Sequence, residues 1–227
     1  MQTMRRPAVF SFEMSKKKGV MYDLDGTLVS TIELHKRAWE LAAKQFQVVL
    51  TPQMLIDQNG MRSQDATRMM LPKEKQYLGE EFAKAKAQFV DKDPTKVEMF
   101  PFVAETLEKL ITRGCLIWIC TSARKDFVHR VMKDAQGLEL LKEKVVFREM
   151  YAEGKPSAEP LLLTLSHMSL KPEEVVYVGD AFTDYEASRN ADMSFLYFLP
   201  EGREQDPRIP QEIPRLKFHK DILSYIK

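Results

Sequence analysis

Apolar residues along this chain occur in short unbroken runs that alternate with segments of helical spacing. Five runs are predicted to be buried strands: Gly19–Leu24, Cys115–Thr121, Lys144–Arg148, Val175–Asp180 and Ser194–Leu199. Three segments between them have apolar residues at helical spacing: Phe102–Thr112, Phe127–Met132 and Leu161–His167. Unbroken apolar strands separated by helices are typical of a parallel sheet that is covered on both faces. The pattern therefore predicts an α/β protein with a doubly wound, Rossmann-like core.

The alternation of strands and helices stops between residues 32 and 98. Three stretches in this segment have helical spacing: His35–Phe46, Gln64–Met70 and Glu80–Val90. No convincing strand pattern lies between them. We therefore predict an α-helical cap domain at residues 32–98, inserted after the first strand into a core made of residues 1–31 and 99–227. Hinges are expected near residues 29–33 and 99–101.

Composition and charge exclude several classes of protein. The chain has 227 residues, of which 44% are hydrophobic and 30% charged, and its formal net charge is +1. A nearly neutral chain gives no reason to expect nucleic acid or an anionic membrane as a partner. No apolar run approaches the roughly 18 residues of a membrane-spanning helix. Residues 1–18 lack the apolar core of a secretory signal and are interpreted as a ragged leader.

The two cysteines indicate a reducing compartment. Cys115 and Cys120 fall in one predicted strand, where they lie about 16 Å apart and are too distant for a disulfide. Reduced thiols are typical of the cytoplasm, so we expect a cytoplasmic location. The sequence is equally compatible with a monomer and a homodimer.

Polar residues gather after four of the predicted strands. They are Asp23 and Asp25 after the first strand, Thr121 and Ser122 after the second, Lys155 after the third, and Asp180 and Asp184 after the fourth. In a doubly wound sheet these strand ends converge on one crevice. Neighbouring carboxylates repel one another and favour a hard cation with oxygen ligands, such as Mg²⁺ with a substrate phosphate. A carboxylate can also attack a phosphoryl group whose charge is offset by lysine and hydroxyl donors. The crevice is therefore predicted to be a Mg²⁺-dependent site for phosphoryl transfer.

With the motifs MYDLDGTLV, Thr121-Ser122, GKPSAEP and GDAFTD in this order, the chain resembles the haloacid dehalogenase-like hydrolases. It is most similar in pattern to their phosphatases with a helical cap, in the phosphoglycolate phosphatase and β-phosphoglucomutase branches. The resemblance implies that Asp23 is the nucleophile and that Asp25 is the general acid and then the general base. It also implies that Thr121 binds the phosphoryl oxygens and that Lys155 steadies the nucleophile and the phosphate.

The same resemblance implies a set of Mg²⁺ ligands. They are the side chains of Asp23 and Asp180 and the backbone carbonyl of Asp25, with Asp184 assisting directly or through water. Each motif taken singly has an ordinary structural explanation, such as a solvated turn for the two aspartates or a helix N-cap for Thr121-Ser122. Their occurrence at four successive strand ends is what favours a site.

Four further residues are candidate substrate contacts: His35, Arg62, Ser122 and Arg124. His35 resembles a histidine seen at the hinge in several capped family members, and Arg62 falls in a loop where members often carry a substrate-contacting group. A position on a solvated helix surface would explain His35 and Arg124 equally well.

The favoured function is hydrolysis of a small phosphorylated metabolite, which the sequence does not identify. A sugar-phosphate mutase of the β-phosphoglucomutase type is the main alternative, because HKRAW and GMRSQD resemble that branch. Thr27 and the second acid at Asp184 resemble the phosphatases instead. A catalytically idle phosphate- or metal-binding module is a further alternative, although such a module usually lacks part of the set that is intact here.

Overall fold

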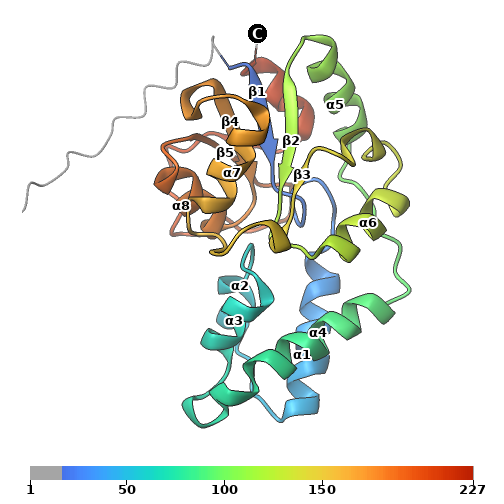
Figure 1. The fold of residues 1–227 in the computed structure, drawn as a ribbon, viewed down its shortest axis with the longest axis vertical. Coiled ribbons are helices and arrows are strands. Elements are labelled where there is room, and N and C mark those ends of the chain that lie inside the picture. The colour runs from blue at the N-terminus through green and yellow to red at the C-terminus, as the bar shows by residue number, and fades with distance from the viewer. Residues whose placement is uncertain (1–16, 227) are drawn as a thin grey trace, which may run out of the picture.

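The computed structural model describes residues 17–226, so that residues 1–16 of the predicted leader lie outside the described residues. A six-stranded parallel sheet forms the centre of the core (Figure 1). Its strands are β1 (Gly19–Tyr22), β2 (Leu116–Cys120), β3 (Val145–Val146), β4 (Val175–Gly179), β5 (Ser194–Phe198) and β6 (Arg215–Leu216). Their order is β3-β2-β1-β4-β5-β6, and all neighbours are parallel. The predicted doubly wound, Rossmann-like α/β fold is confirmed.

Helices cover both faces of this sheet. Those of the core are α5 (Val103–Thr112), α6 (Lys125–Asp134), α7 (Glu159–Met168) and α8 (Phe182–Asn190). Because side chains alternate along a strand, Val20 and Tyr22 of β1 pack with residues of α5 and α6, whereas Met21 packs with α7 and α8. The central strands are buried on both faces, which explains their unbroken apolar sequence.

Two strands differ from the sequence prediction. β3 has only two residues, because the chain leaves the sheet at Phe147 and enters a 3₁₀ turn at Arg148–Met150. The sixth strand, β6, was not predicted, because two residues that follow Pro214 carry too short a pattern to be recognised. Neither difference changes the order of the strands that carry the candidate site.

Residues 32–92 form a separate helical body below the sheet in Figure 1, at the carboxyl ends of β1 and β2. Its helices are α1 (Ile32–Phe46), α2 (Pro52–Asp57), α3 (Ser63–Met70) and α4 (Gly79–Lys92), with a 3₁₀ helix at Lys73–Leu78. The body has an apolar cluster of its own around Trp39, Met70 and Phe82, with the Trp39 and Phe82 rings 5.3 Å apart. No residue of this body joins the sheet, as the helical pattern predicts, and its role as a cap domain remains a prediction.

The two chain crossings between core and helical body lie side by side. Ser30 donates its backbone N–H to the Glu98 carbonyl at 2.9 Å, and Phe100 donates to the Leu28 carbonyl at 3.0 Å. This pairing coincides with the two predicted hinges.

None of the helices within residues 17–226 has the length and apolar character needed to cross a membrane.

Candidate active site

Three acidic side chains that follow β1 and β4, one of them in the first turn of α8, lie together in the structure. The parallel pairing of Tyr22 with Val178 brings these strand ends level. Asp23, Asp180 and Asp184 are buried, and each has a carboxylate oxygen within 4.8 Å of the others. Three carboxylates so close together need a positive charge among them.

Lys155 supplies one such charge. Its side chain is fully buried, and Nζ donates hydrogen bonds to Asp23 Oδ1 at 2.7 Å, Asp184 Oδ1 at 2.6 Å and the Tyr177 hydroxyl at 2.9 Å. Burial acts to lower the pKa of Lys155, but Asp184 and Asp23 outweigh burial and hold the pKa well above its usual value. The ammonium therefore stays charged. Its hydrogen bond to Asp23 places it beside the residue that the resemblance implies to be the nucleophile, and Tyr177 is a third partner that the sequence did not indicate.

Asp180 is held by two residues that the sequence analysis did not assign to the site. The Thr27 hydroxyl donates to Oδ1 at 2.7 Å, and Arg203 Nη1 donates to Oδ2 at 2.8 Å. Burial raises the pKa of Asp180 to about 6, although Arg203 acts to lower it. Thr27 lies inside the predicted motif, whereas Arg203 comes from a loop after β5 that carries no recognisable pattern.

Asp25 is connected to the helical body through a chain of hydrogen bonds. Its Oδ1 accepts from the Thr31 hydroxyl at 2.5 Å and lies 3.1 Å from Nε2 of His35, while Lys86 Nζ lies 3.0 Å from Nδ1 of the same histidine. Burial acts to raise the pKa of Asp25, but His35 and Thr31 outweigh it and the pKa is lowered. Burial also lowers the pKa of Lys86 to about 8. His35 thus links the second aspartate to α4.

Lys86 had a signal in the sequence that the analysis did not use. Phe82, Lys86 and Val90 are spaced four residues apart and lie on the buried face of α4. A lysine on an apolar helix face needs a partner within the protein, because an ammonium is costly to bury alone.

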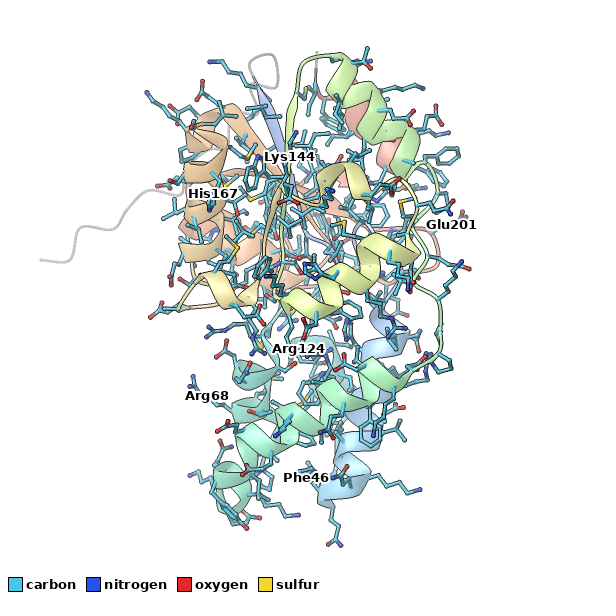
Figure 2. The ribbon with its side chains drawn as sticks, turned by 45° about the vertical axis from the view of Figure 1, so that its right-hand side comes forward. Phe46, Arg68, Arg124, Lys144, His167 and Glu201 are labelled. Atoms are coloured by element: carbon cyan, nitrogen blue, oxygen red, sulfur yellow. The ribbon has the colours of Figure 1, made fainter. Side chains whose placement is uncertain are left out.

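A cavity of about 80 Å³ lies between the core and the helical body. Asp23, Asp25, Asp180, Thr121, Ser122, His35, Lys86, Arg124 and Arg148 are among its lining residues. Figure 2 shows Arg124 at the junction between α6 and α4. Its guanidinium donates to Asp91 Oδ1 at 2.7 Å. The cavity lining therefore combines three core carboxylates with four basic side chains, His35, Lys86, Arg124 and Arg148.

Two hydroxyls of the core hold a loop of the helical body over this cavity. Ser122 Oγ donates to the Gly60 carbonyl at 2.6 Å, and Thr183 Oγ1 donates to the Asn59 carbonyl at 2.8 Å. Gly60 has a φ of 75°, and an added Cβ would lie 2.1 Å from Thr183 Oγ1. Glycine is therefore required at this position, both for its backbone and for the close approach.

Three predicted site residues, Arg62, Lys155 and Asp184, do not line the cavity. Lys155 and Asp184 still belong to the site, because Lys155 donates hydrogen bonds to Asp23 and Asp184. Arg62 is held elsewhere. Its Nε donates to Asp65 Oδ2 at 2.6 Å, and its Nη1 donates to the Ala152 carbonyl. Asp65 lies in the first turn of α3 and captures the guanidinium locally. The structure therefore brings together every other predicted site residue and places Arg62 in a contact between the helical body and the core.

The fold and this site define a Rossmann-like hydrolase with paired aspartates after its first strand. The sequence model of the haloacid dehalogenase-like hydrolases matches residues 20–198, and the chain belongs to this family. The resemblance noted in the motifs and the hydrolase class are thereby confirmed.

Among similar proteins, the pyrophosphatase PpaX of Oceanobacillus iheyensis is 23% identical, with 77% of this chain and 79% of the relative covered. A phosphoglycolate phosphatase of Salmonella choleraesuis is 27% identical, with 77% and 78% covered. Among solved structures, a hydrolase from Pseudomonas syringae has a TM-score of 0.79 at 22% identity, with 92% of this chain and 97% of that chain covered. A candidate β-phosphoglucomutase from Bacteroides vulgatus has a TM-score of 0.75 at 20% identity, with 94% and 92% covered. These structures share the fold.

Proposed function

We propose that this chain is a Mg²⁺-dependent phosphatase that hydrolyses a small phosphorylated metabolite through an aspartyl-phosphate intermediate. The observation that carries the proposal is the ammonium of Lys155, which is buried between Asp23 and Asp184 beside the carboxylate of Asp180. Transfer of a phosphoryl group is a reaction that uses an anionic nucleophile, a fixed cationic donor and a divalent cation together. Similarity to proteins named phosphatases supports the same function.

The reaction is proposed to proceed in two steps. A carboxylate oxygen of Asp23 attacks phosphorus, the bond from phosphorus to the leaving oxygen breaks, and Asp25 gives that oxygen a proton. Asp25 then takes a proton from water, whose oxygen attacks phosphorus, and the bond between Asp23 and phosphorus breaks to release inorganic phosphate. Thr121, buried at the end of β2, is expected to bind the phosphoryl oxygens, and Lys155 to offset their charge.

The donor set fits Mg²⁺. Burial raises the pKa of both Asp23 and Asp180, and the nearby Asp184 carboxylate raises both further, so the group carries an excess of negative charge that a divalent cation would offset. We propose the two side chains and the backbone carbonyl of Asp25 as ligands. Asp184 accepts hydrogen bonds on both oxygens, from Lys155, Tyr177 and the Ala181 N–H, so we assign it an indirect role. When bound, Mg²⁺ would neutralise charge on the transferred group.

Removal of the metal is expected to abolish phosphatase activity. EDTA should eliminate turnover, and added Mg²⁺ should restore it. Asp180→Asn keeps the shape of the side chain but removes its charge, so the Mg²⁺ concentration for half-maximal activity should rise on the order of 100-fold. Asp192→Asn, at an exposed position, is the matched control. Full activity in excess chelator would contradict the proposed metal site.

The chain of Lys86, His35 and Asp25 gives a predicted pH dependence. We expect it to return protons to Asp25, which must be protonated to act as an acid although its pKa is lowered. Lys86 has a pKa of about 8, so it carries its proton below that pH and loses it as the pH rises. kcat/KM should therefore fall as the pH increases through 8.

Replacement of Lys86 tests this assignment. Lys86→Met should lower kcat/KM about 10- to 100-fold at pH 7 and remove the decline above pH 8. Lys84→Met, on the exposed face of the same helix, should keep the wild-type profile. If kcat/KM of Lys86→Met still declined above pH 8, the decline would have to come from another titrating group.

A panel of phosphorylated metabolites tests the function itself, with release of inorganic phosphate as the measurement. The mutase alternative is tested in parallel with glucose 1-phosphate, a trace of the bisphosphate and Mg²⁺. Phosphate release without glucose 6-phosphate supports a hydrolase, and efficient formation of glucose 6-phosphate would overturn it. Thr27 is one of the residues in which the sequence resembles the phosphatases and not the mutases. Its hydroxyl donates a hydrogen bond to Asp180, which is consistent with the hydrolase proposal.

We also propose a cytoplasmic location. Cys115 and Cys120 are both free and buried, which is consistent with a reducing compartment.

A further inference from the structure

The charged side chains around the cavity have partners within the protein, with one exception. Lys155 pairs with Asp23 and Asp184, Arg203 with Asp180, Arg124 with Asp91, and Lys86 and His35 form the chain to Asp25. Arg148 also lines the cavity. Its side chain makes no hydrogen bond or ion pair with any residue of the described range 17–226.

The backbone fixes Arg148 at the edge of the site. Arg148 opens the 3₁₀ turn that follows β3, and its N–H donates to the Ala123 carbonyl at 3.0 Å. Lys86 also lines this cavity, and the positive charge of Arg148 acts to lower its pKa. The side chain is half-buried, where an unpaired guanidinium is less well solvated than on an open surface.

The register of the sheet separates Arg148 from the reacting aspartates. Val146 pairs with Cys120 on β2, and the preceding residue of β2, Ile119, pairs with Tyr22 on β1. Arg148 therefore follows a strand that lies two positions away from β1, or about 10 Å across the sheet. The phosphoryl group that Asp23 attacks sits at the end of β1. Thr121 and Lys155 are already assigned to that phosphoryl group, so an anion paired with Arg148 is assigned to a different group of the same ligand.

We propose that Arg148 binds a second anionic group of the substrate, so that the preferred substrates are compact phosphomonoesters that also carry a carboxylate or a second phosphate. This inference rests on the proposed phosphatase function. A cavity of about 80 Å³ favours a small ligand, with the second anion only a few bonds from the transferred phosphoryl group. An arginine suits either anion, because its planar donors match carboxylate and phosphate alike.

Binding of phosphonates, which cannot be hydrolysed at their C–P bond here, tests the inference without turnover. The probes are ethylphosphonate, with one anionic group, 3-phosphonopropionate, with an added carboxylate, and propane-1,3-bisphosphonate, with an added phosphonate. Calorimetry on the full chain with Mg²⁺ should show at least one of the two longer probes binding about 10-fold or more tightly than ethylphosphonate. The probe that gains more identifies carboxylate or phosphate as the second group.

Arg148→Met should reduce that preference to about twofold or less, and Arg148→Lys should keep part of it, because a point charge replaces the planar donor. Arg68→Met is the control, since Arg68 is exposed on the outer side of the helical body (Figure 2). Thermal unfolding of each variant checks that it is folded. An equal affinity of the wild-type chain for all three probes, or a full preference in folded Arg148→Met, would overturn the inference. A preference for the doubly anionic probes in a chain that hydrolyses no phosphomonoester would instead refute only the proposed function.

Discussion

Asp23→Asn is expected to abolish turnover, with a loss on the order of 10⁴-fold or more, because an amide cannot form the aspartyl-phosphate. Asp25→Asn should lower kcat by about 10²- to 10⁴-fold for a different reason, since it removes the proton donor and the base for water while the nucleophile stays intact. The two variants should therefore differ in covalent labelling. With a radiolabelled phosphoryl donor that has a good leaving group, Asp25→Asn should retain a phosphoenzyme, and Asp23→Asn should retain none.

Asp126→Asn, at an exposed position on α6, controls for the loss of a carboxylate elsewhere and should behave as wild type. Thermal unfolding should accompany the assay, because Asp23 is buried against Lys155. Equal labelling of the two active-site variants would contradict the assigned roles of Asp23 and Asp25.

Lys155→Met is expected to have the largest effect on stability. The change leaves the buried carboxylates of Asp23 and Asp184 without their shared ammonium, which should lower the free energy of unfolding by about 3–5 kcal/mol at neutral pH. In the wild-type chain the folded-state pKa of Lys155 is raised, so the stabilisation is fully present below its unfolded pKa and is lost as the pH rises through the folded value.

In the variant, stability should already fall with rising pH near neutrality. Burial raises the folded-state pKa of Asp23 and Lys155 acts to lower it, so without the ammonium that pKa rises further above its unfolded value. The folded state then binds more protons and becomes more stable as the pH falls. Urea unfolding at pH 5 and pH 8 without metal should give a smaller loss at pH 5. Lys142→Met, at an exposed position, is the control. A loss below about 1 kcal/mol at both pH values would show that the buried pair is not needed for stability.

The parts of the site that could be predicted from the sequence are those that follow strands. Asp23, Lys155 and Asp180 come directly after apolar runs or within a short motif, and parallel strands bring such ends together whatever the rest of the chain does. Lys86 and Arg203 could not be placed in this way. Lys86 reaches His35 only because α1 and α4 pack together, and Arg203 reaches Asp180 from a loop.

The prediction for Arg62 shows a second limit. Its loop does approach the core, but the direction of the side chain depends on Asp65, three residues further along the chain, which holds the guanidinium away from the cavity. Arg148 is the opposite case, a residue that the sequence did not assign to the site but that lines the cavity. The sequence predicts it as the last residue of the strand Lys144–Arg148. The strand ends two residues earlier, and this leaves Arg148 at the rim of the cavity.

The contacts of Ser122 and Thr183 with the loop over the cavity have a consequence for how this protein could diversify. Both hydroxyls bind backbone carbonyls, those of Gly60 and Asn59, and so they recognise the path of the loop and not its side chains. Gly60 excepted, neither of these two contacts depends on which side chain the loop carries. New substrate preferences could therefore arise through substitutions in the loop, and loops exchanged between relatives should seat on the same two hydroxyls.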